Sequence, residues 1–188
     1  MFLKLHTIIC STRPGRNGPH VAKWFHGMAQ QHGKFDAHLI DLAEFNLPIF
    51  DEPLHPRLQK YEHAHTRAWS ESVQAADAFV FVTPEYNFNM PPALLNALDF
   101  LSKEWNYKPA GFVSYGGVSG GLRSVQMSKQ VVAALKMMPM AEGVAIPSFT
   151  THLDEDKNFT PNDLIVASVK PMLDELHRWA EALKPMRG

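Results

Sequence analysis

The chain has 188 residues, of which 45% are hydrophobic and 20% are charged, and its formal net charge is -1. This composition is typical of one globular domain, and the near-zero charge provides no overall field to recruit nucleic acid or a membrane surface. Cys10 is the only cysteine, which excludes an internal disulfide. Residues 1–10 are too short and too interrupted for a signal segment, and no apolar run approaches the ~20 residues that span a bilayer. We therefore expect a cytoplasmic protein.

Apolar runs rich in β-branched and aromatic residues alternate along the chain with segments of helical periodicity. This alternation predicts βαβ units around a parallel sheet. The five predicted strands are Leu3–Cys10, Ala37–Leu42, Phe79–Thr83, Ala110–Ser114 and Gly143–Ile146. The five predicted helices are Gly18–Gln31, His65–Gln74, Ala93–Leu101, Leu122–Lys136 and Pro161–Leu183. We expect residues 1–188 to form a single α/β domain with strand order 2-1-3-4-5 and a ligand site beside its first and third strands.

The loop from Ser11 to Pro19 follows the first predicted strand. It combines hydroxyl groups, two guanidinium groups and two glycines with the start of a helix. Free backbone N–H groups and the helix dipole both favour an anion, and an arginine adds charge-assisted bonds. Neither the G-x-G-x-x-G fingerprint nor the Walker loop is present, so a mononucleotide with one phosphate is the ligand indicated. The alternative is a surface turn with solvated arginines.

The segment from Thr83 to Pro91 follows the apolar run of residues 78–82 and reads T-P-E-Y-N-F-N-M-P. Its prolines fix φ near both ends, while Asn87 and Asn89 tolerate unusual dihedrals and present amide edges. A rigid polar loop at the carboxyl end of a strand suits a flat heterocycle with several hydrogen-bonding edges. The alternative is a proline-bounded turn whose tyrosine packs against the protein.

The loop from Ser114 to Gly121 has four glycines in six positions, which let the backbone approach a ligand closely. Tyr115 can stack on or cap a ligand, and Ser119 is the predicted N-cap of the next helix. A flexible glycine turn is the alternative. Because the three loops follow strands one, three and four, we expect them at one edge of the sheet, where one holds a phosphate and two grip a ring.

In this order the motifs resemble those of the NADPH-dependent FMN reductase family, a flavodoxin-like group that includes quinone, azo-dye and metal-ion reductases. They are S-T-R-P-G-R at residues 11–16, P-E-Y-N at 84–87 with L-x-N-A-L-D at 94–99, and S-Y-G-G-V-S-G-G at 114–121. The resemblance covers most of the chain. Two positions depart from the family pattern: Cys10 stands where a glycine commonly precedes the serine, and Pro92 stands where a glycine often follows Pro91.

The resemblance implies a bound FMN and a set of residues that hold it. These are Ser11, Arg13, Arg16 and Asn17 at the phosphate, Pro84, Glu85, Tyr86 and Asn87 along the isoalloxazine, and Tyr115, Gly116 and Gly117 at the pyrimidine side, with Ser119 in the same loop.

The resemblance also implies the reaction. NADPH or NADH stacks on the exposed flavin face, passes a hydride to N5 and leaves, and a quinone, flavin, azo compound or similar small acceptor then takes its place. Backbone N–H groups around Asn87 and Gly116 are expected to stabilise charge on the reduced pyrimidine, so no side chain is assigned a catalytic role. We expect Glu85 to orient its loop or to face an adjacent subunit rather than to act as a general acid.

Other constellations are weaker. His55, His63 and His65 look like a metal cluster, but positions i and i+2 do not share a helix face, so no metal is expected. A hydrolase set of Ser114, Ser119, His152 and Asp154 lacks the G-x-S-x-G motif. The methionines between 137 and 140 are interpreted as core or as a pliable contact surface.

Two further functional classes stay open: a flavodoxin-like electron carrier and a non-enzymatic flavin sensor. Carriers are usually strongly acidic, whereas this chain is nearly neutral, which favours the reductase. We also expect a homodimer or a tetramer with flavin near the subunit boundary. Phe88, Met90 and Trp105 are predicted to lie in loops and to supply the apolar contact surface, while Leu94, Leu95 and Phe100 are assigned to the subunit's own core.

Overall fold

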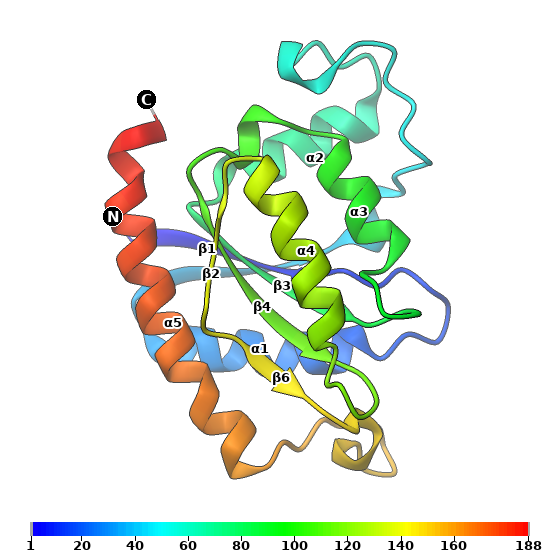
Figure 1. The fold of residues 1–188 in the computed structure, drawn as a ribbon, viewed down its shortest axis with the longest axis vertical. Helices are drawn as coiled ribbons and strands as arrows, with labels where there is room; N and C mark the ends of the chain where they lie inside the picture. Colours follow the sequence, from blue (N-terminus) through cyan, green and yellow to red (C-terminus); the bar gives the residue numbers. More distant parts are fainter. Residues whose placement is uncertain (1, 188) are drawn as a thin grey trace.

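A parallel sheet of six strands runs through the computed structural model, which describes residues 2–187 (Figure 1). The strands are β1 (Leu3–Ile9), β2 (Phe35–Asp41), β3 (Ala78–Pro84), β4 (Pro109–Tyr115), β5 (Met138–Pro139) and β6 (Val144–Ile146). They are hydrogen-bonded in the order β2-β1-β3-β4-β5, with β6 also paired to β4. The predicted strand order is confirmed, and β1 and β3 lie at its centre.

Five α-helices cover the two faces of the sheet. They are α1 (Gly18–His32), α2 (Ala64–Ala75), α3 (Pro92–Asp99), α4 (Leu122–Ala134) and α5 (Asp163–Leu183). Helices α1 and α5 pack on one face, and α2, α3 and α4 on the other. Strand β3 serves both cores, because Val80 and Val82 belong to the first and Phe79 and Phe81 to the second. This follows from the two-residue repeat of a strand buried on both sides.

The main departure from the predicted fold is at the last strand position. The strand predicted at Gly143–Ile146 corresponds to β6, which pairs with the end of β4, and a further two-residue strand, β5, pairs with the start of β4. Met138 N donates to Lys108 O, just before β4, and Met140 N donates to Ala110 O in β4, so the N–H that Pro139 lacks would point away from the sheet. Met137 and Met140 are buried, which confirms their interpretation as core residues.

Two residues predicted to form a contact surface lie in the core instead. Trp105 is fully buried beside α3, and its indole N–H donates to the carbonyl oxygen of Leu98 at 3.3 Å. Met90 is 6% exposed. Leu95, assigned to the core, is instead 40% exposed, whereas Phe88 is 65% exposed as expected. Met90 does lie in a loop, whereas Trp105 ends the short 3-10 helix Lys103–Trp105. The prediction failed for both because a position between predicted elements does not reveal how deeply the segment folds back.

The long segment between β2 and α2 is fastened to the rest of the molecule by polar contacts. It contains the short 3-10 helices Leu42–Phe45 and Pro56–Leu58. Asn96 of α3 holds it from one side, because its amide donates to Pro48 O at 2.7 Å and accepts from Phe50 N at 2.9 Å. This proline-rich segment therefore has a defined shape.

Two histidines considered as metal ligands close the same segment. His63 precedes α2, so the helix-face argument against the pair does not apply to it. The rings of His63 and His65 stack with centroids 5.2 Å apart, and His65 bonds to Asp51 at 3.0 Å. Within residues 2–187, no group of three or more His, Cys, Asp or Glu is arranged to hold a metal ion.

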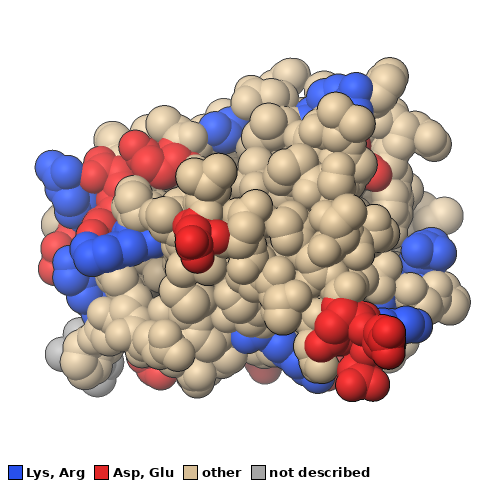
Figure 2. Space-filling view, turned by 90° about the horizontal axis from the view of Figure 1, so that it is seen from below, with Lys and Arg blue, Asp and Glu red and all other residues tan. Residues whose placement is uncertain are grey.

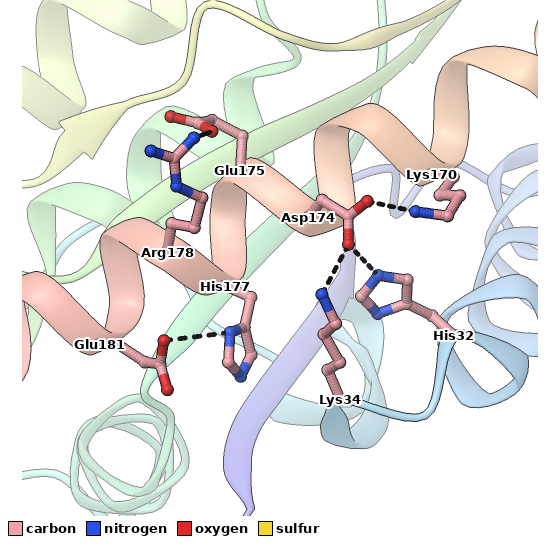
Figure 3. Close-up of polar contacts among 8 residues, drawn as sticks. All are labelled: His32, Lys34, Lys170, Asp174, Glu175, His177, Arg178 and Glu181. Carbon is pink, nitrogen blue, oxygen red and sulfur yellow. Dashed lines mark hydrogen bonds and ion pairs between the residues drawn. The ribbon is translucent and has the colours of Figure 1, made fainter.

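Helix α5 is fixed to the turn between α1 and β2 by a cluster of charged residues (Figure 3). The Asp174 carboxylate accepts from Lys34 at 2.9 Å, bonds to His32 at 3.0 Å, and also pairs with Lys170. These hydrogen bonds hold the pKa of Asp174 well below its ordinary value. None of the helices in the described part of the chain is long and apolar enough to cross a membrane.

Candidate functional site

A cleft of about 210 Å³ opens where the loops after β1, β3 and β4 meet. Nine of its ten lining residues were predicted from the sequence: Arg13, Arg16, Asn17, Pro84, Glu85, Tyr86, Tyr115, Gly116 and Gly117. The tenth is Phe149. Three other predicted residues, Ser11, Asn87 and Ser119, belong to the same loops but do not line this cleft. The fold thus brings together residues that are more than a hundred positions apart in the chain.

The loop after β1 is shaped by a tight turn. Arg16 N donates to Arg13 O at 3.1 Å, with Pro14 and Gly15 between them. Gly15 has φ +69°, which is the conformation that a type II turn requires at this position. Within the described residues, the backbone N–H groups of Thr12, Arg13 and Gly15 have no hydrogen-bond acceptor. Unpaired N–H groups just before a helix suit an anion.

The two arginines of this loop differ in their partners. Arg16 donates from its two terminal nitrogens to the two oxygens of Asp41, at 2.6 and 2.5 Å, and also bonds to Ser11 O. Asp41 ends β2, so Arg16 fastens the loop to the neighbouring strand. Arg13 is exposed, and no acceptor among residues 2–187 pairs with its guanidinium group. Of these two arginines, Arg13 is therefore the one whose guanidinium group can form charge-assisted hydrogen bonds to a ligand.

A buried contact joins the loops after β1 and β4. The Tyr115 hydroxyl donates to Ser11 Oγ at 3.3 Å, and the Tyr115 side chain is almost fully buried. Burial raises the pKa of Tyr115, so the hydroxyl stays protonated at neutral pH. Gly18 leaves room for this contact, because a Cβ there would collide with Ser11 Oγ and lie 2.9 Å from the Tyr115 hydroxyl. Two side chains predicted to face a ligand are therefore bonded to each other.

The P-E-Y-N motif ends in a two-residue hairpin. Tyr86 and Asn89 exchange backbone hydrogen bonds of 2.9 and 3.0 Å around Asn87 and Phe88. Both central residues are left-handed, with φ +51° and +67°. Asparagine adopts this conformation readily, as the sequence predicted, but an aromatic residue does so at a cost of about 1–3 kcal/mol. The hairpin presents the backbone of Asn87 at its tip.

Glu85 fastens this hairpin to the glycine-rich loop and to α4. Its carboxylate accepts from Ser119 Oγ at 2.9 Å, from Arg123 N at 3.1 Å and from Arg123 Nε at 2.6 Å. Arg123 also lies over the Phe88 ring, 3.8 Å from its centroid. Burial raises the pKa of Glu85, but the hydrogen bonds from Ser119 and Arg123 outweigh it and hold the pKa below its ordinary value. The carboxylate is thus ionised and its hydrogen-bonding capacity is largely used.

The glycine-rich loop is bonded to the end of β6 and to the segment that follows it. Gly116 N donates to Ile146 O at 3.3 Å, and Gly116 O accepts from Phe149 N at 3.0 Å. The Gly116 N–H was expected to face a reduced ring, but it is already hydrogen-bonded to Ile146 O. The predicted N-cap is also wrong: α4 is capped by Gly121 at φ +81°, and the Ser119 hydroxyl donates to Glu85 instead.

Sequence reasoning missed three residues that shape the site. Phe149, in the 3-10 helix Phe149–His152, packs edge-to-face on Tyr115 with ring centroids 5.3 Å apart. Asp41 binds Arg16, and Arg123 binds Glu85. A carboxylate at the end of the strand neighbouring the loop was the available signal for Asp41. Nothing in the spacing of the motifs indicated Phe149, because it comes from beyond the last of them.

The surface around this edge of the sheet is mostly uncharged. Figure 2 views the molecule from the end where β6 and the segment after it lie, and it shows a broad central area with few charged side chains. Acidic residues gather at one corner, and further charges gather at the opposite end. Such a face suits a largely apolar ring held by a few polar groups. Fold and site together define a flavodoxin-like α/β protein with a cleft at the carboxyl edge of its sheet.

Comparison with known proteins identifies the family of the chain. Residues 3–151 match the family model described as NADPH-dependent FMN reductase. An NAD(P)H-dependent FMN reductase of Schizosaccharomyces pombe is 40% identical over 171 residues, which cover 82% of this chain and 85% of the relative. A quinone reductase of Escherichia coli is 31% identical, with 73% of each chain covered. The chain belongs to the NADPH-dependent FMN reductase family, a family of oxidoreductases.

Solved structures agree on the fold. FerB of Paracoccus denitrificans, a flavoenzyme NAD(P)H:(acceptor) oxidoreductase, superposes with a TM-score of 0.74 at 18% identity. The match covers 96% of this chain and 98% of that one. This likeness confirms the predicted flavodoxin-like architecture along almost the whole chain.

Proposed function

We propose that this protein binds FMN in the cleft at the carboxyl edge and uses NADPH or NADH to reduce a small acceptor such as a quinone, a flavin or an azo compound. The observation that carries the proposal is the meeting of the three family motifs around one cleft. FMN supplies the chemistry when bound, since its ring accepts a hydride and passes the electrons on. The protein supplies binding, orientation and shielding from water.

The residues divide this work unequally. Arg13 and the unpaired N–H groups of the loop after β1 hold the phosphate. Arg16 keeps that loop in shape through Asp41, and Asn17 lines the cleft at the start of α1. Along the ring, Pro84, Tyr86 and the tip of the hairpin supply the contact surface.

Backbone N–H groups stabilise the negative charge on the reduced flavin ring. Asn87 N and Gly117 N have no acceptor among the described residues, whereas Gly116 N is already bonded. These two N–H groups therefore replace Gly116 N in stabilising the pyrimidine side. Glu85 is ionised and held by Arg123, so it positions the hairpin and does not donate a proton.

The absorption spectrum of the purified protein is the first test. A flavin spectrum that bleaches on anaerobic addition of NADPH and returns with a quinone supports the reductase. Parallel double-reciprocal plots at several quinone concentrations are expected, because donor and acceptor use the same flavin face in turn. Intersecting lines would contradict a shared face. Bleaching without steady-state turnover would favour the electron carrier or the sensor.

We also propose a homodimer or tetramer in the cytoplasm. The support is an exposed apolar set at the site edge, in which Phe88 is 65% exposed, Val118 94% and Leu95 40%. Exposed patches of this kind usually mark interfaces, and a closed twofold contact would cover them. The buried single cysteine is compatible with a reducing compartment. Sedimentation at micromolar concentration tests the assembly: a monomer that holds FMN and turns over at full rate would refute it.

A further inference from the structure

A second hollow lies on the other side of the loop after β1. Its volume is about 390 Å³, and its walls include Thr12, Leu42, Leu47, Ala93 and Asn96. Thr12 follows β1, Leu42 follows β2, and Ala93 lies in the first turn of α3, so the hollow is at the same edge of the sheet as the cleft. The two meet at the peptide between Thr12 and Arg13, whose Cα atoms are about 3.8 Å apart.

The lining of this hollow has no charged side chain. Leu42, Leu47 and Ala93 provide apolar walls, while the Thr12 hydroxyl has no partner among residues 2–187. Asn96 forms a fixed wall, because both ends of its amide hold the segment around Pro48. An uncharged hollow does not suit a phosphate or a metal ion. Apolar walls with a few polar groups suit a planar, uncharged heteroaromatic ring.

The hydride donor of the proposed reaction carries such a ring, its adenine, close to this hollow. A dinucleotide donor has two ring systems, and when its nicotinamide lies on the flavin its adenosine half must lie within reach of the cleft. Two larger hollows, of about 580 and 660 Å³, share no residue with the three loops of the site. The first of them is lined by several charged side chains, including Lys103, Lys108 and Arg187.

We propose that the hollow beside Thr12 binds the adenine ring of the hydride donor. The proposal rests on the proposed flavin site, and it assigns a role to residues of the segment after β2 and of α3. Thr12 and the amide of Asn46 supply the polar contacts at its rim, and the alanine at position 93 leaves the space in which the ring lies. FMN and the donor therefore share the loop after β1 but use its opposite sides.

Ala93→Phe is the test, because it fills the hollow from a half-buried helix position. The matched control is Ala133→Phe, which adds the same ring at an exposed position of α4 outside every hollow described above. Binding of 5′-AMP, measured by calorimetry or saturation-transfer NMR, is expected to weaken about tenfold to hundredfold in Ala93→Phe and to be unchanged in the control. This readout does not depend on turnover.

Kinetics with a truncated donor separate this inference from the flavin site itself. Reduced nicotinamide mononucleotide lacks the adenosine half, so the ratio of kcat/KM for NADPH to that for the mononucleotide is expected to fall at least about tenfold in Ala93→Phe. Leu47→Ala, which removes one wall, should lower the same ratio less. FMN content is measured in each variant.

The outcomes are distinct. Equal binding of 5′-AMP to wild type and Ala93→Phe, or an unchanged donor ratio, would overturn the adenine site. An unchanged ratio together with a dissociated assembly would show that a second copy of the chain fills the hollow. A wild-type protein without FMN, or without turnover of the mononucleotide, would instead refute the proposed function.

Discussion

The loop after β1 and the hairpin after β3 lie at the same edge of the sheet but are prepared for a ligand in different ways. The hairpin is bonded to the protein on several sides, through Glu85, Ser119 and Arg123. In the loop after β1, Arg13 and several N–H groups have no partner among the residues that the structure describes. Groups already bonded contribute shape, and unbonded groups contribute affinity. Substitutions in and around the hairpin should therefore change stability, and those in the loop after β1 should change FMN binding.

The largest effect is expected in Gly121→Ala. Gly121 lies in the glycine-rich loop, to which Glu85 bonds the hairpin. Gly121 has φ +81°, and a Cβ there would lie 2.8 Å from Tyr115 N and 2.9 Å from Ser114 Cβ. We expect a loss of roughly 3 kcal/mol or more in the free energy of unfolding. Urea denaturation without added FMN measures it. Gly117→Ala is the control, because a Cβ at Gly117 meets nothing within 4 Å; equal losses in both variants would contradict the account.

Arg13→Ala tests the unbonded region. Removing a charge-assisted partner should weaken FMN binding by about 1.5–3 kcal/mol. The stability of the protein without FMN should be unchanged, because the guanidinium group has no partner within the described chain. Fluorescence titration with FMN measures the affinity. Lys23→Ala, which removes an exposed charge on α1, should bind FMN normally. Normal binding by Arg13→Ala and Arg16→Ala as well would place the phosphate elsewhere.

Glu85→Gln tests how the Glu85 carboxylate contributes to stability at different pH values. The substitution keeps the size of the side chain but weakens its bonds to Ser119 and Arg123, so we expect a loss of about 1–2 kcal/mol at neutral pH. The pKa of Glu85 is below its ordinary value of 4.5, so its contribution is present above pH 4.5 and is lost as the pH falls through the lowered pKa. Urea titrations between pH 7 and pH 3 should show the two proteins converging. A difference that grows on acidification would contradict this.

The smallest effect is expected far from the site, in Asp174→Asn. The pKa of Asp174 is lowered by its bonds to Lys170, Lys34 and His32 (Figure 3). Its stabilising contribution is therefore present above the ordinary pKa of 3.8 and lost at lower pH. Thermal unfolding should show a slightly less stable variant at neutral pH. FMN affinity should be unchanged, and a weakened affinity would mean that the two ends of the sheet are coupled.

The sequence predicted the strand order and the loops that meet, because both follow from local patterns. Residues 78–82 are apolar throughout, as a central parallel strand requires, and motif positions after strands determine the edge at which the loops lie. The hydrogen-bond partner of each polar side chain in the site was not predictable in the same way. Whether Arg16 faces a phosphate or Asp41, and whether Ser119 caps a helix or binds Glu85, depends on distances between segments far apart in the chain.

The shortness of β5 and β6 has a consequence for solubility. An edge strand offers unpaired backbone groups to other chains, and long flat edges promote aggregation. Here one edge of the sheet consists of a two-residue and a three-residue strand, interrupted between Met140 and Gly143. The opposite edge, β2, carries Asp36 and His38, whose side chains are in contact, with His38 Nε2 3.1 Å from the Asp36 carboxylate. The short, interrupted strands at one edge and the polar side chains of β2 at the other disfavour extension of the sheet by a neighbouring chain, which favours association through helices and loops.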